Sequence, residues 1–195
     1  MIVAKLPSYV QVAVSGLLFA LVHSALASMT CKRFATRYGV SMRSYRLAYT
    51  LLAMVMTGIW MSWLRHLPDA PLYAWPEGWR WLARLVQFVG LYVLWRTFVS
   101  FDVAAFLGLR AGGEDAFHER GMYRYMRHPM YSGVMLILLA RPEQSVNGLA
   151  FTLVVGLYFV IGARLEERRM LLEHPAYAGY RRRVPAFIPR LSLRH

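Results

Sequence analysis

The residues most able to do chemistry gather in one segment, residues 121–133. It holds three tyrosines, two arginines and a histidine directly before an apolar run that starts at Val134. Arg and His side chains bind carboxylates and phosphates, and Tyr rings stack on flat ligands. The segment therefore predicts an anion and aromatic-ring site. The alternative is a basic-aromatic belt that anchors a helix at a membrane interface.

A pair of carboxylates, Glu166 and Glu167, follows the apolar run of residues 146–163. Three arginines stand beside the pair, so one interpretation is a solvated patch of ordinary surface ion pairs. A carboxylate that faces a pocket would instead accept two hydroxyls, as a ribose requires, or attract a cation such as a sulfonium. Both interpretations stay open at this point.

A third block, residues 177–189, is basic, aromatic and interrupted by prolines. Such a segment is typical of a helix that lies on a membrane surface with its arginines toward anionic headgroups. The alternative is a lid that folds over a pocket.

The composition indicates what must position these blocks. The chain has 195 residues, of which 57% are hydrophobic and 17% charged, with a net charge of +13. The basic residues lie between apolar runs, which argues against nucleic-acid binding and for membrane loops. The single cysteine, Cys31, excludes an intramolecular disulfide, and the sequence has no Cys/His cluster with zinc spacing, so no metal site is predicted.

Five apolar runs predict an all-α, multi-pass transmembrane bundle of about five helices, in residues 9–29, 47–64, 81–109, 130–140 and 146–163. The fourth run has 11 residues, about 16 Å as a helix, and cannot cross a core of about 30 Å alone. It either extends back through Tyr123 and restarts at Pro129, or forms a short hairpin with the fifth run. The chain is expected to be a single membrane domain, with N-terminal helices in residues 1–109, a cofactor-binding region in residues 110–195 and a cytoplasmic C-terminal helical segment.

Loop charges predict the orientation. The first loop, the third loop and the C-terminal part carry 17 Lys and Arg residues, against five on the other side. The positive-inside rule places the N-terminus outside and the C-terminus in the cytoplasm of an inner membrane of bacterial type. Polar residues inside apolar runs are functional candidates by default. Asp102 and His23 are the better substrate-side candidates among them.

The three blocks together resemble a known family. They read Gly-x-Tyr-x-x-x-Arg-His-Pro-x-Tyr-x-Gly from Gly121, Glu-Glu-Arg from Glu166, and Tyr-x-x-Tyr-x-x-x-Val-Pro-x-x-Ile-Pro from Tyr177. This set resembles the integral-membrane methyltransferases that use S-adenosylmethionine, which include isoprenylcysteine carboxyl and phospholipid methyltransferases. Residues 101–110 and the turn at residues 140–142 are similar to the methanethiol S-methyltransferase and nitric-oxide-accessory branch.

The resemblance implies a pocket for S-adenosylmethionine between the Arg-His-Pro block and the Glu-Glu block, under the C-terminal segment. The glutamates would hold adenosyl hydroxyls or stabilise a neighbouring arginine. The residues implied for this pocket are Tyr125, His128, Tyr131, Gly133, Glu166, Glu167, Tyr180, Arg182 and Pro185.

The expected reaction is direct methyl transfer to a lipophilic or small acceptor, a thiol, carboxylate or amine, that enters from the lipid bilayer. Arg127 or Arg124 would orient an acceptor anion, and Asp102 is the third catalytic candidate. Expected partners are membrane lipids and the acceptor, without nucleic acid. One alternative is a sterol-type membrane reductase that uses NADPH. Another is a non-catalytic membrane accessory protein of nitrogen-oxide metabolism.

Overall fold

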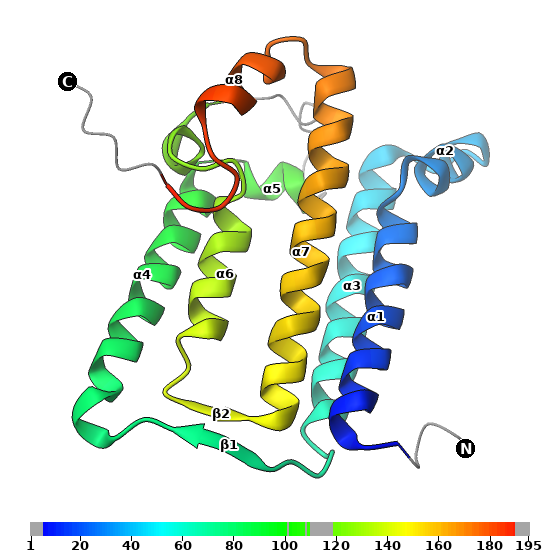
Figure 1. The fold of residues 1–195 in the computed structure, drawn as a ribbon. Coiled ribbons are helices and arrows are strands. Elements are labelled where there is room, and N and C mark those ends of the chain that lie inside the picture. Colours follow the sequence, from blue (N-terminus) through cyan, green and yellow to red (C-terminus); the bar gives the residue numbers. More distant parts are fainter. Residues whose placement is uncertain (1–5, 101, 108, 110–118, 190–195) are drawn as a thin grey trace, which may run out of the picture. The chain divides into compact units, whose positions relative to one another are not determined.

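The computed structural model describes residues 6–100, 102–107, 109 and 119–189. Helices dominate these residues, and the two short strands pair with each other (Figure 1). The predicted all-α membrane class is confirmed. The elements are α1 (Ser8–Ala27), α2 (Met29–Arg37), α3 (Met42–Leu64), β1 (Pro71–Ala74), η2 (Glu77–Trp79), α4 (Arg80–Val99), α5 (Val103–Phe106), η3 (Gly121–Arg124), α6 (Pro129–Leu139), β2 (Glu143–Ser145), α7 (Val146–Glu173) and α8 (Tyr177–Arg183).

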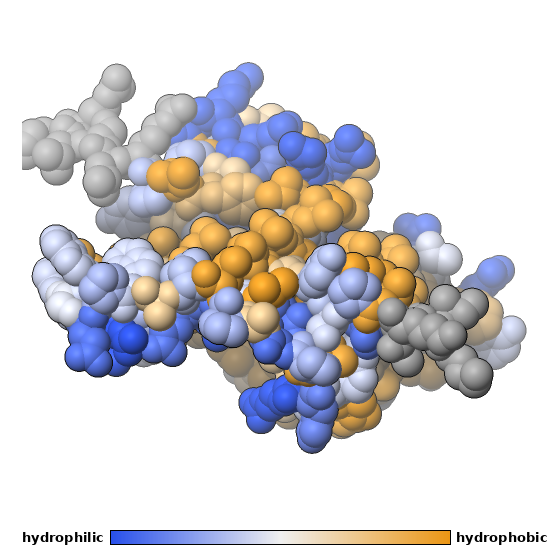
Figure 2. Space-filling model, turned by 60° about the horizontal axis from the view of Figure 1, so that its bottom comes forward, coloured by the Kyte–Doolittle hydropathy of each residue, from blue (hydrophilic) through white to orange (hydrophobic). Residues whose placement is uncertain are grey.

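Four helices in the described part of the chain are long and apolar enough to cross a membrane: α1, α3, α4 together with η2, and α7. Large apolar side chains along them, such as Leu21, Met54 and Phe88, are about two-thirds exposed. On the face that Figure 2 draws, hydrophobic side chains are exposed over broad areas, next to hydrophilic ones. An aqueous protein would bury such side chains, whereas a lipid bilayer solvates them.

Two helices end at other residues than the predicted apolar runs. The third run ends at Val99, where α4 stops. The fifth run continues ten residues beyond Ala163, to Glu173, so α7 has 28 residues. Among the described helices that match the five predicted runs, α6 is the short one, with 11 residues. Arg, Glu, Leu and Met are strong helix formers, so a helix continues through a charged segment that hydropathy does not register.

The described residues fall into two compact units. The first comprises Met1–Leu72, Asp102–Glu114 and Ser145–Val154, and the second Tyr73–Phe101, Asp115–Gln144 and Val155–His195. In the first unit, the indole of Trp60 donates to the Ser15 hydroxyl at 3.0 Å, and the Tyr49 hydroxyl meets the His23 ring at 2.8 Å. Hydrogen bonds of this kind join apolar helices where lipid offers no polar partner. Helices α1 and α3 therefore form a hydrogen-bonded pair.

In the second unit, α4 and α6 cross where two glycines face each other. A Cβ on Gly90 would lie 2.7 Å from the carbonyl oxygen of Gly133, and a Cβ on Gly133 would lie 2.9 Å from that of Gly90. Only residues without side chains allow two helix backbones to approach this closely. The crossing fixes α6 against α4, and α6 in turn carries the polar cluster described below.

The segment around α6 follows α4 beyond the crossing. At one end, a Cβ on Gly121 would clash with the side chain of Ser100, just after α4. At the other, the Trp75 amide donates to the carbonyl of Pro142 at 2.8 Å, just before η2 and α4. Residues 121–142 thus run along the length of α4, although α6 itself has only 11 residues.

Pro129 begins α6, and the alternative of a helix that continues back through Tyr123 is not formed. Proline fits the first helical turn because the N–H that it lacks would have no partner there. The preceding residues form the separate turn η3, which starts at Gly121 with φ 58°. Residues 126–128 therefore run as non-helical backbone directly before α6.

Candidate functional site

A buried carboxylate, that of Glu167 on α7, is the centre of the polar cluster in the second unit. Its Oε1 accepts from Arg127 Nε at 2.7 Å and lies 3.0 Å from His128 Nε2. Its Oε2 lies 3.0 Å from Nε of Arg181 on α8. Only 9% of the Glu167 side chain is exposed. One carboxylate thus joins the segment before α6, α7 and α8.

The Arg127 guanidinium makes contacts through all three of its nitrogens. Nε and Nη2 meet Glu167, each at 2.7 Å. Nη1 donates to the carbonyl oxygens of Arg181, at 3.0 Å, and Val184. A planar fork of donors suits this arrangement, whereas a lysine ammonium offers no such fixed geometry. Arg127 therefore clamps the C-terminal segment onto α7, a role that the sequence analysis did not assign to it.

The chain after α8 lies along the start of α6. The amide of Arg127 donates to Pro185 O at 2.9 Å, and that of His128 donates to Ala186 O at 2.9 Å. The Ser132 hydroxyl donates to Phe187 O at 2.7 Å. The non-helical backbone before α6 exposes these amides, and residues 185–187 supply the acceptors that they need.

Helix α8 is held by a small apolar core of its own. Tyr177, Tyr180 and Val184 are buried together, with Met170 and Leu171 of α7 against them. The Tyr180 hydroxyl donates to the carbonyl oxygen of Tyr123 at 2.7 Å. Burial raises the pKa of Tyr180 well above its ordinary value. Its phenol therefore stays protonated and remains a hydrogen-bond donor at neutral pH.

Glu166 has a different environment from its neighbour, because successive residues on a helix point about 100° apart. Its side chain is 46% exposed, and its Oε2 lies 3.7 Å from His128 Nδ1, beyond hydrogen-bond range. Burial, with the Glu166 charge second, raises the pKa of Tyr123 to about 12. Glu166 thus keeps an accessible carboxylate among tyrosines.

Aromatic rings form one wall of the cluster. His128 stacks on Tyr131 with ring centroids 5.5 Å apart, and Tyr131 stacks on Phe159 of α7 at 4.4 Å. The ring of Phe187 lies 5.5 Å from that of His128. Stacked rings exclude water from one side of the carboxylate pair and fix the His128 ring between Glu166 and Glu167.

The structure brings most of the predicted site residues together. Those in or beside the cluster are Arg127, His128, Tyr131, Glu166, Glu167, Tyr180 and Pro185.

The other predicted site residues lie elsewhere. Tyr125 and Arg182 are exposed, as is Arg124 at the end of η3. Gly133 packs against the backbone of α4 and not into the cluster. Asp102 is exposed and belongs to the first unit.

Several contributors were not singled out from the sequence. Arg181 and Phe159 are the main ones, and the Ser132 hydroxyl, which donates to the carbonyl oxygen of Phe187, is another. For Arg181 and Phe159, helical spacing in the sequence could have indicated that they lie beside motif residues. Phe159 precedes Glu166 by seven residues, and Arg181 follows Tyr177 by four, so each pair shares a helix face.

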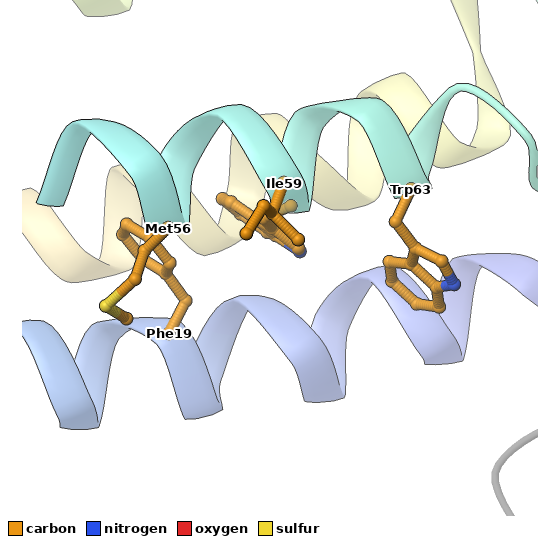
Figure 3. A pocket seen from close by; sticks show the side chains of 5 residues that line it. Phe19, Met56, Ile59 and Trp63 are labelled. Atoms are coloured by element: carbon orange, nitrogen blue, oxygen red, sulfur yellow. The ribbon is translucent and has the colours of Figure 1, made fainter. Parts of the chain in front are cut away.

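A separate groove lies in the first unit, between α1 and α3. Figure 3 shows the side chains that line it, with Phe19 on α1 and Met56, Ile59 and Trp63 on α3; Trp60 completes the lining. Its volume is about 290 Å³. None of the five lining residues carries a charge, so this groove offers no acid, base or anion-binding group.

Known proteins are similar to this chain over most of its length. The family model described as NnrU protein matches residues 12–141. The methanethiol S-methyltransferase 2 of Bradyrhizobium diazoefficiens is 31% identical over 192 residues, which cover 91% of this chain and 71% of that protein. The methanethiol S-methyltransferase of Pseudomonas deceptionensis is 28% identical over 191 residues, 89% of this chain and 70% of that protein.

A further relative matches a shorter part of this chain and is not named as a methyltransferase. The cobalt-zinc-cadmium resistance protein CzcN of Cupriavidus metallidurans is 39% identical over 77 residues, 37% of this chain and 35% of that protein. No solved structure matches the chain at a significant level.

Proposed function

Because the chain belongs to the NnrU protein family and matches methanethiol S-methyltransferases over most of its length, we propose that it is a membrane methyltransferase that uses S-adenosylmethionine. The observation that carries this proposal is the division between the two glutamates. Glu167 is neutralised by Arg127 and Arg181, while Glu166 stays accessible beside aromatic rings. Glu167 therefore has a structural role, and the Glu166 carboxylate is accessible to a ligand.

The residues present fit this donor. An adenosyl group requires a flat apolar surface and acceptors for its hydroxyls, and its sulfonium requires a negative charge nearby. The rings of Tyr131 and Phe159 and the carboxylate of Glu166 supply these features. Gly162 of α7 adds space, since a Cβ there would meet no described side chain within 4 Å other than the Tyr131 hydroxyl, at 3.8 Å. Glu166, Tyr131 and Phe159 would hold the donor.

S-Adenosylmethionine supplies a methyl group on a positively charged sulfur, which a thiolate accepts in a single displacement. The protein then contributes mainly orientation and a site from which water is excluded. A small thiol is the acceptor that the relatives favour, since two of them are named methanethiol S-methyltransferases. The thiolate gains the methyl carbon, the sulfonium becomes a thioether, and both charges disappear.

Arg124 is the better candidate for holding an acceptor anion. Arg127 is engaged through all three guanidinium nitrogens, whereas Arg124 is exposed at the end of η3, next to Tyr123. An exposed guanidinium attracts thiolates and carboxylates as they approach. Replacing Arg124 with Gln should raise KM for the acceptor severalfold and leave donor binding unchanged.

Binding and turnover together test the function. Detergent-solubilised full-length protein is titrated by calorimetry with S-adenosylmethionine, S-adenosylhomocysteine and NADPH, and labelled methyl transfer to methanethiol is then measured. We expect heat with the two adenosyl compounds and label in dimethyl sulfide. Heat with NADPH alone would favour the reductase. A folded sample that binds no adenosyl compound would overturn the proposal.

We also infer that the site opens to the cytoplasm, where the donor is made, because loop charges favour that side for the C-terminus. Cysteine labelling tests the orientation. In a Cys31→Ala background, exposed Arg182→Cys should resist a membrane-impermeant maleimide in intact cells, and exposed Gly78→Cys should react. The reverse pattern would contradict the orientation without affecting the proposed reaction.

A further inference from the structure

Helix α2 connects the two spans α1 and α3 of the first unit, and none of its residues belongs to the methyl-transfer site proposed above. We propose that α2 is an interfacial helix that binds anionic phospholipid headgroups of the surrounding membrane. Its basic stripe, Arg33 and Arg37, meets the headgroups, and its apolar stripe, Phe34 and Tyr38, enters the adjoining acyl region. A helix that projects into water, or one that binds another protein, is the competing possibility.

The first argument is the position of α2. Tyr45, near the start of α3, donates from its hydroxyl to the carbonyl oxygen of Leu26, near the end of α1, at 2.6 Å. The two apolar spans therefore end at the same level, where hydrocarbon gives way to headgroups. In Figure 1, α2 turns away from the axes of α1 and α3 at this end. A short amphipathic helix at that level lies along the membrane surface.

Local sequence makes α2 a separate helix with its own direction. The Ser28 hydroxyl accepts from the Cys31 amide at 3.3 Å and caps the first turn. Gly39, with φ 82°, ends the helix, and the Val40 amide donates back to the carbonyl oxygen of Ala35 at 3.1 Å. Glycine adopts this left-handed conformation without steric cost, so it stops the helix. Helix α2 therefore does not continue into α3.

The second argument is the distribution of side chains around α2. Arg33 and Arg37 are four residues apart and form one stripe, and Phe34 and Tyr38 form the next stripe, about 100° around the helix. The two rings contact each other, with centroids 4.8 Å apart. Phe34 is 62% exposed and Tyr38 is 75% exposed, so the described protein leaves the apolar stripe largely uncovered. An apolar stripe beside a basic one is typical of helices that lie at the headgroup level.

The third argument is charge. Five Lys and Arg residues lie between Lys32 and Arg46, and no Asp or Glu precedes Asp69 in the sequence. Arg33 and Arg37 are exposed, and no carboxylate in the described part of the chain pairs with either. A guanidinium binds phosphate oxygens through two parallel N–H donors. Anionic headgroups therefore supply the negative charge that this part of the chain lacks.

Lipid selectivity separates this surface from the general attraction of a chain with a net charge of +13. Delipidated full-length protein in detergent is titrated with phosphatidylglycerol and with phosphatidylcholine of equal chain length, and bound lipid is counted by native mass spectrometry. The variant Arg33→Gln/Arg37→Gln is compared with Arg65→Gln/Arg84→Gln, which removes two exposed arginines outside α2 and gives the same net charge.

Wild type should prefer phosphatidylglycerol. Each arginine near an anionic surface contributes about fivefold in affinity, so the preference should fall about fivefold or more in the α2 variant. It should stay within about twofold of wild type in the control variant. The same loss in both variants, or no preference in wild type, would overturn the proposal.

A second measurement locates the two stripes and does not require the double variants to fold. In a Cys31→Ala background, Phe34→Cys and Arg33→Cys each carry a bimane label in full-length protein in nanodiscs that contain phosphatidylglycerol. We expect brominated acyl chains to quench the label at position 34 and aqueous iodide to quench the label at position 33. Equal iodide quenching at both positions would show that the apolar stripe is outside the membrane and would overturn the proposal.

Discussion

Arg127 and Glu167 stand forty positions apart in the sequence, yet the Arg127 guanidinium meets one Glu167 carboxylate oxygen through both Nε and Nη2, each at 2.7 Å. The side chains are only 11% and 9% exposed. Because the same guanidinium also binds the carbonyls of Arg181 and Val184, the pair attaches the C-terminal segment to α7. The ion pair is therefore a structural element of the candidate site.

Replacing Arg127 with Gln should leave Glu167 buried and only partly balanced. Breaking a buried ion pair by removing one partner costs about 3–5 kcal/mol. We expect a lower unfolding temperature in detergent and faster chymotryptic cleavage near Tyr177. Arg182→Gln, which removes an exposed arginine from α8, is the matched control and should behave as wild type. If chymotrypsin cleaved Arg127→Gln no faster than Arg182→Gln, the structural role of Arg127 would be contradicted.

The helix crossing gives a steric prediction. Gly133→Ala would place a Cβ 2.9 Å from the carbonyl oxygen of Gly90 and 2.8 Å from Leu94 Cγ, so α4 and α6 must separate. Inserting a methyl group into a tight contact typically costs about 1–3 kcal/mol. Gly58→Ala on α3 is the control, since a Cβ there meets nothing within 4 Å. Thermal unfolding should show a loss for Gly133→Ala and no loss, or a small gain, for Gly58→Ala.

The raised pKa of Tyr177 predicts that the protein loses stability in alkaline solution. Burial raises the pKa of its phenol to about 12, and the negative charge of Glu167 adds to the shift. In the unfolded chain the phenol ionises near pH 10. Because the folded-state pKa is the higher one, this contribution to stability is complete below about pH 10 and is lost as the pH rises toward 12.

The measurement is the unfolding temperature of wild type and Tyr177→Phe between about pH 8 and pH 11, around the ordinary tyrosine pKa. Wild type should lose more stability over this range than the variant, which has one ionisable phenol fewer. Tyr38→Phe, at a 75% exposed position, should retain the wild-type slope. A Tyr177→Phe profile parallel to wild type would contradict the assignment.

Part of this arrangement could be predicted from the sequence, through hydropathy and through the resemblance of three motif blocks to a known family. Hydropathy alone predicted the apolar helices, and the fourth apolar run, residues 130–140, nearly coincides with α6. The Arg-His-Pro and Glu-Glu blocks were expected to line one pocket, because the family resemblance implies it. The contacts of Arg127 and His128 with Glu167 agree with that expectation.

The division of roles within the blocks could not be predicted, because it depends on helix rotation. Glu166 and Glu167 are identical in type and adjacent, and only the packing of α7 decides which one faces Arg127. Gly133 belongs to the sequence motif, yet its neighbour is α4, an element about forty residues earlier in the chain. Long-range packing of this kind leaves little local signal in a single sequence.

The hydroxyl of Tyr180 gives a final prediction, which links α8 to the turn beside Glu166. It donates to the Tyr123 carbonyl at 2.7 Å, and the side chain is 2% exposed. Tyr180→Phe keeps the ring and removes the donor, so a carbonyl loses its partner at a cost of about 1–3 kcal/mol. Because Tyr123 is near Glu166, the change should also weaken S-adenosylhomocysteine binding severalfold.

Calorimetry and thermal unfolding of the same samples separate the two effects of Tyr180→Phe. Tyr125→Phe, two residues along at a 55% exposed position, is the control and should change neither quantity. A Tyr180→Phe protein that unfolds at a lower temperature but binds with wild-type affinity would limit this hydrogen bond to docking α8. If the unfolding temperature and the affinity for S-adenosylhomocysteine both fall, η3 keeps its position beside Glu166 only while α8 holds it there.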